Sequence, residues 1–153
     1  MSNLKKRPAK NMEVRNQVKD SKFYGSIFAV ENRLEAEKRI TEIKDKYPDA
    51  THNVSAFRVE SPKPDQDPVE YFDDDGEPSG SSGPPVLEAI KGEKLLNTVI
   101  IVTRYFGGTK LGIGGLIRAY GDTARLAIKE AGIETLSEFY QIEVQTSFAN
   151  IGI

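Results

Sequence analysis

The stretch that decides the fold runs from Arg104 to Tyr120 and reads RYFGGTKLGIGGLIRAY. It follows the run Thr98 to Thr103, which has the composition of a β-strand and is apolar on both faces. A strand of that kind is predicted to be central and buried. After the glycines a helical pattern continues to about Ala131, and Gly132 is its predicted stop. The segment therefore predicts a strand, a glycine-rich turn and a long helix.

The turn combines glycines with charges that are all positive. Glycine tolerates positive φ and lets the backbone approach a neighbour or a ligand closely. A strand–turn–helix junction of this kind can aim unpaired N–H groups at an anion. We therefore take it as the candidate binding site; the alternative is that the glycines only make a tight connection. The glycines are Gly107, Gly108, Gly112, Gly114 and Gly115, and the cations are Arg104, Lys110 and Arg118.

The common nucleotide-binding motifs do not fit this turn. A phosphate-binding P-loop needs Lys and then Ser or Thr near its last glycine, whereas Gly112 is followed by Ile113 and another glycine. The dinucleotide fingerprint fails because Ile117 stands where its third glycine is required. Binding of an anion here would therefore have to use a different arrangement.

Two further features upstream carry chemistry. Asp73, Asp74, Asp75 and Glu77 lie close together, and such carboxylates need water, cations or N–H donors to relieve their repulsion. Mg²⁺ would suit these oxygens, although the acids are consecutive rather than alternating as in a calcium loop. An acidic turn that pairs with a basic partner is the alternative. His52, the only histidine, is either a hydrogen-bonded structural residue or part of a site.

The order of predicted elements indicates an α+β domain. Residues 12–18 and 23–30 are predicted strands, Asn32 is a predicted N-cap of a helix that Pro48 stops, and 51–59 is a further strand. A short apolar helix, capped by Ser81 or Ser82, precedes the central strand. We expect two layers, with the helices on one face of the sheet. Residues 1–11 are basic and are predicted to form a flexible tail.

Composition bounds the remaining possibilities. The chain has 153 residues, which is room for one domain, and 38% of them are hydrophobic. Its 21 basic and 23 acidic residues nearly balance, so net charge does not indicate nucleic-acid binding. The absence of cysteine excludes disulfides, thiolate catalysis and cysteine-based zinc sites. With no apolar run near the roughly 20 residues that span a bilayer, we expect a cytoplasmic protein without membrane contact.

Three motifs together resemble the IMPACT/YigZ family. They are Ala50-Thr51-His52-Asn53, Asp74-Asp75-Gly76-Glu77-Pro78-Ser79-Gly80, and the run from Tyr105 to Tyr120. They occur in the family's order, and the resemblance covers roughly Phe23 to Gly132. One departure is Ser81-Ser82-Gly83, where members commonly carry Thr-Ala-Gly.

The resemblance implies a fold and a domain organisation. The fold is that of ribosomal protein S5 domain 2, and it would occupy residues 12–136. Members often continue into a ferredoxin-like second domain, so residues 137–153 would be its beginning.

The resemblance also implies a role as a non-enzymatic regulator linked to translation, which binds RNA, the ribosome or a regulatory protein. The alternatives are a Mg²⁺-dependent phosphoryl or nucleotide hydrolase and a pure protein-interaction module. We predict no catalytic residue, no bound metal and no cofactor. The predicted binding residues are Arg104, Tyr105, Phe106, Gly107, Gly108, Lys110, Gly112, Gly114, Gly115, Arg118, Tyr120, His52, Asp74, Asp75 and Glu77.

Overall fold

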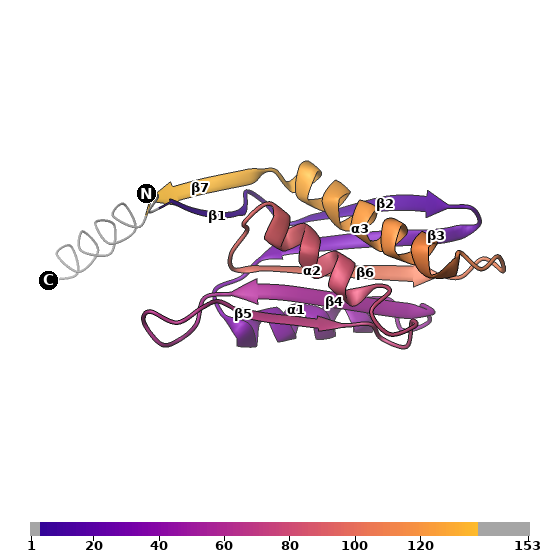
Figure 1. Cartoon of the computed structure of the whole chain (residues 1–153), viewed down its shortest axis with the longest axis horizontal. Helices are drawn as coiled ribbons and strands as arrows, with labels where there is room; N and C mark the ends of the chain where they lie inside the picture. Colours follow the sequence, from indigo (N-terminus) through magenta and orange to yellow (C-terminus); the bar gives the residue numbers. More distant parts are fainter. Residues whose placement is uncertain (1–3, 138–153) are drawn as a thin grey trace, which may run out of the picture.

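The computed structural model describes residues 4–137, which form a main sheet, a two-stranded ribbon and three helices (Figure 1). The elements follow in the order β1 (Leu4–Pro8), β2 (Met12–Val18), β3 (Ser21–Ala29), α1 (Arg33–Lys46), β4 (His52–Val59), β5 (Val69–Asp73), α2 (Gly83–Gly92), β6 (Thr98–Tyr105), α3 (Gly112–Ala131) and β7 (Ile133–Ser137).

The main sheet has five antiparallel strands in the order β2-β3-β6-β4-β5. Strand β6 lies in the middle of this order and is buried from Thr98 to Arg104, as its apolar sequence predicts. Because β6 leads directly into the glycine-rich turn, the sheet fixes where that turn begins. The α+β class is confirmed.

The helices cover both faces of the sheet, which corrects the expectation of helices on one face. Ile100 and Val102 of β6 pack in the core beneath α2 and α3, whereas Val99 and Ile101 pack in a second core beneath α1. Figure 1 shows α2 and α3 in front of the sheet and α1 behind it. The physical reason is the apolar character of β6 on both sides, since an uncovered apolar face would be left in water.

The predicted helix ends are confirmed for α1 and α3. The Asn32 side chain accepts a hydrogen bond from the Glu35 N–H at 2.9 Å, so Asn32 is the N-cap of α1. That helix ends at Lys46, before Pro48, which cannot continue it. Helix α3 ends at Ala131, and Gly132 follows with a φ of 74°.

The N-terminal segment from Leu4 is not a flexible tail. Strand β1 pairs antiparallel with β7, and the Leu96 N–H donates to the Lys6 carbonyl at 2.8 Å. Its positive charges meet acids, because Lys5 lies 2.6 Å from Glu60 and Arg7 lies 2.7 Å from Glu134. Backbone pairing and these ion pairs together hold the segment in place.

Two expectations concern other parts of the chain. The predicted beginning of a second domain, residues 137–153, falls outside the described residues except for Ser137, which closes β7. None of the helices in the described part of the chain combines the length and apolar character that crossing a bilayer requires.

Candidate binding site

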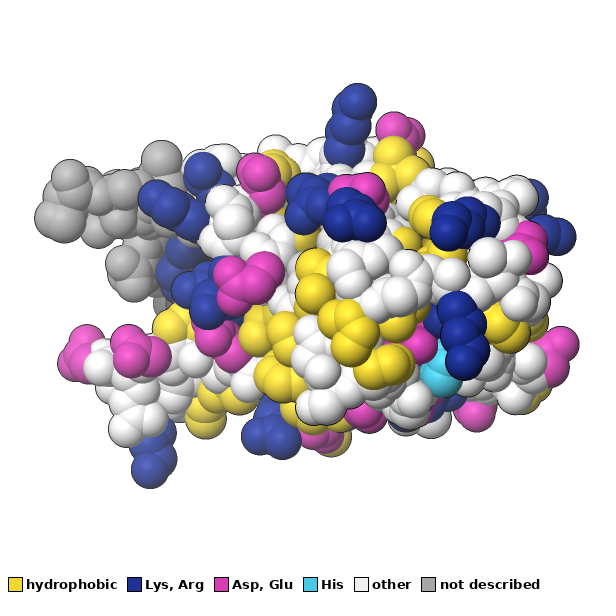
Figure 2. All heavy atoms as spheres, turned by 45° about the vertical axis from the view of Figure 1, so that its right-hand side comes forward, with side chains coloured by type: hydrophobic (Ala, Val, Ile, Leu, Met, Phe, Trp, Pro, Cys, Tyr) yellow, Lys and Arg dark blue, Asp and Glu magenta, His cyan; other side chains and the backbone are white. Residues whose placement is uncertain are grey.

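A pocket of about 370 Å³ brings the three sequence motifs together at the end of the sheet. It lies beside the connection between β6 and α3, residues 106–111, which we call the glycine loop. We call the cavity the loop pocket. Figure 2 shows the histidine side chain at the surface beside basic side chains. The lining residues are Thr51, His52, Glu77, Pro78, Arg104, Phe106, Lys110, Leu111, Gly112, Ile113 and Leu116.

A buried polar network forms the floor of the loop pocket. Arg104 donates to the Glu77 carboxylate at 2.8 Å, and the Tyr120 hydroxyl donates to the same oxygen at 2.5 Å. His52 Nε2 lies 3.4 Å from the other Glu77 oxygen, and Ser21 Oγ accepts from Arg104 at 3.2 Å. Burial, and then the Glu77 carboxylate, raise the pKa of Tyr120 far above its usual value. The phenol therefore stays protonated and remains a donor.

This network changes the interpretation of two predicted binding residues. Arg104 is 4% exposed and is neutralised by Glu77, so its charge is not free for an external anion. Tyr120 is fully buried, and its ring packs edge-on against Phe23, so it is not available for stacking on a base. Both residues support the pocket from inside.

The glycine loop is held against the turn between β2 and β3. The Asp20 carboxylate accepts from the Thr109 hydroxyl at 2.9 Å and from the Thr109 N–H at 3.3 Å. A Cβ atom at Gly107 would lie 1.9 Å from the Asp20 carbonyl oxygen, so only glycine fits there. Gly108 has a φ of 111°, which also favours glycine. These contacts position the loop before any partner arrives.

The outer side of this region is apolar and basic. Lys110 and Arg118 are exposed, and neither forms an ion pair within residues 4–137. Helix α3 begins at Gly112 without a side-chain cap and without an acid in its first turn. Its first N–H groups therefore face solvent or a partner. Large apolar side chains are exposed beside them: Phe106 at 44%, Ile113 at 56% and Ile117 at 43%.

The carboxylates of the acidic turn, residues 73–77, accept hydrogen bonds mainly from groups within the protein. The Asp74 carboxylate accepts from the N–H groups of Gly80, Ser82 and Gly83 and from the Ser82 hydroxyl, at 2.7–3.2 Å. It therefore caps α2, where the Ser82 side chain makes no cap bond. Burial alone would raise the pKa of Asp74, but these donors outweigh it and lower the pKa.

The other members of the turn are also tied to their neighbours. Asp75 accepts from the Asn53 N–H at 2.6 Å, and its carbonyl lies 2.7 Å from His52 Nδ1. Of the predicted acidic residues, only Glu77 lines the loop pocket. Within residues 4–137, no group of three or more His, Cys, Asp or Glu side chains is placed to hold a metal ion.

Other predicted residues divide between the pocket and its surroundings. His52, Phe106, Lys110 and Gly112 line the pocket. The side chain of Tyr105 faces away from the pocket. Arg104, which precedes it on β6, lines the pocket, and successive side chains of a strand point to opposite faces. Gly114 and Gly115 lie in the first turn of α3.

Ile113 and Ile117 are exposed residues of the site that were not predicted from the sequence. Both lie on the first turns of α3, and they are neighbours on its surface because they are four residues apart. The sequence did contain a signal for their exposure, because both isoleucines lie within the glycine-rich segment. Neither belongs to the hydrophobic core.

Comparison with known proteins gives matches over most of the chain. The profile of the Impact N-terminal domain matches residues 19–128. The chain is 41% identical over 116 residues to the IMPACT family member YvyE of Bacillus subtilis. The aligned region covers 76% of this chain and 52% of that protein. It is 31% identical over 142 residues to the IMPACT family member YigZ of Escherichia coli, covering 92% and 68%.

A solved structure described as a hypothetical protein matches the fold with a TM-score of 0.80 and 28% identity, over 90% of this chain and 66% of that one. The chain spans about half the length of YvyE, 52%. The three motifs that meet at the loop pocket also lie within the matched residues 19–128. On this evidence, the chain belongs to the IMPACT family.

Proposed function

We propose that this chain is a non-enzymatic regulator linked to translation, and that the loop pocket binds a segment of a partner protein. One observation carries the proposal. The exposed side chains of Phe106 and Ile113 line a cavity whose rim carries Lys110, a cation that forms no ion pair within residues 4–137, and the exposed Ile117 lies four residues further along α3. A partner segment with an apolar side chain between acidic ones matches this surface in both shape and charge.

A protein partner suits this surface better than RNA does. Base stacking needs exposed aromatic rings, and near the pocket only Phe106 offers one among the described residues. Its neighbours Ile113 and Ile117 are aliphatic and gain most from covering by another apolar group.

Binding also suits the pocket better than hydrolysis does. The hydrolase alternative needs the acidic turn and the glycine loop to converge on one cleft with several oxygen ligands. Glu77 alone reaches the pocket, and it is already occupied by Arg104 and Tyr120. The other alternative is a protein-interaction module that binds its partner through the acidic turn. It is disfavoured because the Asp74 and Asp75 carboxylates already accept hydrogen bonds from N–H groups within the chain.

The link to translation rests on what membership of the IMPACT family implies. The matched region is the Impact N-terminal domain, so the proposal concerns this domain and not the longer relatives as whole proteins.

A peptide titration tests the pocket directly. The probe is a fluorescent peptide set in which one Leu or Phe stands between Asp and Glu residues. The parent chain is expected to bind members of this set, and Ile113→Asp is expected to weaken binding about tenfold or more because it removes the central apolar contact. An acid in the first turn of a helix is favourable to the helix, so α3 should remain folded.

The matched control is Leu34→Asp, which removes the 76% exposed leucine of α1, outside the loop pocket. It is expected to leave the affinity unchanged. The same proteins added to a cell-free translation reaction test the regulatory role: the parent and Leu34→Asp should alter protein output, and Ile113→Asp should not. Binding of structured RNA that Lys110→Ala/Arg118→Ala abolishes, with no binding of the peptides, would replace the protein partner with RNA.

A further inference from the structure

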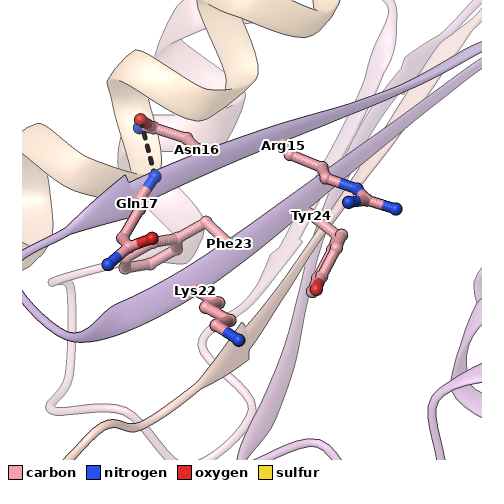
Figure 3. A pocket seen from close by; sticks show the side chains of 6 residues that line it. All are labelled: Arg15, Asn16, Gln17, Lys22, Phe23 and Tyr24. Carbon is pink, nitrogen blue, oxygen red and sulfur yellow. Dashed lines mark hydrogen bonds between the residues drawn. The ribbon is translucent and has the colours of Figure 1, made fainter.

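A second surface of the chain, which shares no lining residue with the loop pocket, has the composition of a nucleic-acid site. It lies on the α1 side of the β2–β3 hairpin. The cross-strand pairs Arg15–Tyr24 and Gln17–Lys22 fix which side chains share this side, and Lys22 is paired in turn with Tyr105 of β6. Asn16 points to the other side, where it bonds Thr123 of α3. Figure 3 shows Arg15, Lys22 and Tyr24 on the hairpin.

Three tyrosine rings form the centre of this surface. Tyr24 stacks on Tyr47 with 5.5 Å between the ring centroids, and Tyr105 packs edge-on against Tyr24 at 6.0 Å. Helix α1 ends at Lys46, so the sheet beyond Tyr47 is left uncovered by that helix. All three rings are half-buried, which leaves part of each at the surface.

Cations surround the rings. The Arg15 guanidinium lies 5.7 Å from the centre of the Tyr24 ring, and Lys22 is exposed on the neighbouring strand. Neither residue forms an ion pair in the part of the chain that the structure describes. A cavity of about 300 Å³ adjoins these residues, and its lining also includes two residues from the other side of the hairpin, Asn16 and Phe23. The remaining lining residues are Arg15, Gln17, Lys22 and Tyr24.

Two acids lie near the rings. Glu13 is paired with Lys46 at 2.8 Å, whereas Asp49 keeps its charge and accepts a hydrogen bond from the Tyr105 hydroxyl at 2.8 Å. Arg15 and Lys22 together exceed Asp49 by one charge, so the balance at this surface is positive, next to aromatic and guanidinium planes. Single-stranded nucleic acids are bound by this combination, with bases stacked on aromatic or arginine planes and phosphates on cations.

We propose that Arg15, Lys22 and the cluster of Tyr24, Tyr47 and Tyr105 form a binding site for a single-stranded nucleic acid. The phosphates lie against the two cations, and one or two bases lie against the exposed parts of the tyrosine rings and the outer face of the Arg15 guanidinium. An acidic protein segment is disfavoured because it would use the two cations but gain little from the exposed parts of the rings. The site is separate from the loop pocket, so it stands or falls independently of the proposed function.

The test is a titration of labelled oligouridine of about 12 nucleotides, which is within the range of known single-strand sites. The parent chain should bind it, and Arg15→Ala/Lys22→Ala should weaken binding about tenfold or more at low salt. The slope of log affinity against log salt should fall by about 1.4, since each lost phosphate contact contributes about 0.7. Both substituted side chains are exposed, and equal melting temperatures will show that folding is unchanged.

Two control variants and one spectroscopic readout define the outcome. Lys38→Ala/Lys129→Ala removes two other exposed cations and should change nothing. Lys110→Ala/Arg118→Ala should also bind like the parent, which separates this site from the loop pocket. Because the chain has no tryptophan, quenching of its tyrosine emission by the oligonucleotide reports stacking directly.

An abasic oligonucleotide of equal length should bind more weakly and should not quench. Equal affinity for the abasic strand, an unchanged affinity of Arg15→Ala/Lys22→Ala, or displacement of the oligonucleotide by polyglutamate at equal charge would each overturn the proposal.

Discussion

The glycine loop and the acidic turn lie near the same end of the sheet, and the sequence marks both as candidate sites, yet the protein uses them differently. In the acidic turn, Asp74 and Asp75 bind backbone N–H groups of the chain itself. In the glycine loop, the Thr109 hydroxyl and N–H donate to the Asp20 carboxylate and fix the position, while Lys110 and Phe106 remain at the surface. The first region builds the fold, and the second presents a surface.

Charged and glycine-rich segments differ in where their polar groups find partners. A buried or partly buried polar group whose hydrogen-bonding capacity is filled from within the chain has a structural role that explains its presence. A fixed loop whose N–H groups lack internal acceptors and whose apolar side chains are exposed has no comparable structural role. Such a surface indicates contact with a partner. Glu77 combines both roles. It lines the loop pocket, but its carboxylate accepts a hydrogen bond from the buried Arg104.

The largest effect is expected from Glu77→Ala. It leaves the Arg104 guanidinium buried without its carboxylate, and breaking one side of a buried ion pair costs about 3–5 kcal/mol. Urea denaturation should show this loss in the free energy of unfolding. The control Glu37→Ala removes an exposed carboxylate that pairs with Arg33 and should cost less than about 1 kcal/mol. Equal, small losses in both would show that Glu77 is not structural.

Asp74→Ala should destabilise the protein by about 2 kcal/mol, because it removes the cap of α2 and several charge-assisted hydrogen bonds. The pKa of Asp74 is lowered in the folded protein, so its stabilising effect is present above the unfolded pKa of about 4 and disappears as pH falls through the folded pKa. The difference in unfolding free energy between parent and variant should therefore shrink in acid. A difference that stays constant down to low pH would contradict the role of the charge.

Gly107→Ala tests the docking of the glycine loop. The new Cβ would overlap the Asp20 carbonyl oxygen, so the loop has to shift, at a cost of about 1–3 kcal/mol. Peptide binding should weaken as well. Gly92→Ala is the matched control, since nothing lies within 4 Å of a Cβ there. It should be neutral or slightly stabilising; thermal melting of both variants decides the comparison.

Lys110→Ala should have the smallest effect. A rim charge mainly accelerates association, so we expect the association rate of an acidic peptide to fall a few-fold and to become less sensitive to salt. Stopped-flow measurements at two salt concentrations check this. A change confined to the dissociation rate would instead place Lys110 in a buried contact.

The sequence predicted local features well. The N-cap at Asn32, the central position of β6 and the stop at Gly132 each depend on residues that are near in the chain, and all three are confirmed. Features that depend on distant residues were missed. Arg104 finds Ser21 and Glu77 at separations of 83 and 27 residues, and β1 pairs with β7.

The same limit applies to the faces of the sheet and to the site. Alternation shows that β6 has two apolar faces, but it does not show which helix covers which face, since that depends on how α1 crosses over. The motifs identified the lining residues His52, Glu77 and Lys110, but not that Asp74 is turned toward α2. Hydrogen-bond geometry was needed to separate the two loops.

The most direct test of the account compares Ile113→Asp and Asp74→Ala in one peptide-binding and unfolding experiment. We expect Ile113→Asp to keep the parent's stability and lose affinity. Asp74→Ala should lose stability and, at a temperature where it is folded, keep the parent's affinity. The opposite pattern, with binding lost in folded Asp74→Ala and retained in Ile113→Asp, would contradict the assignment of the glycine loop as the binding surface.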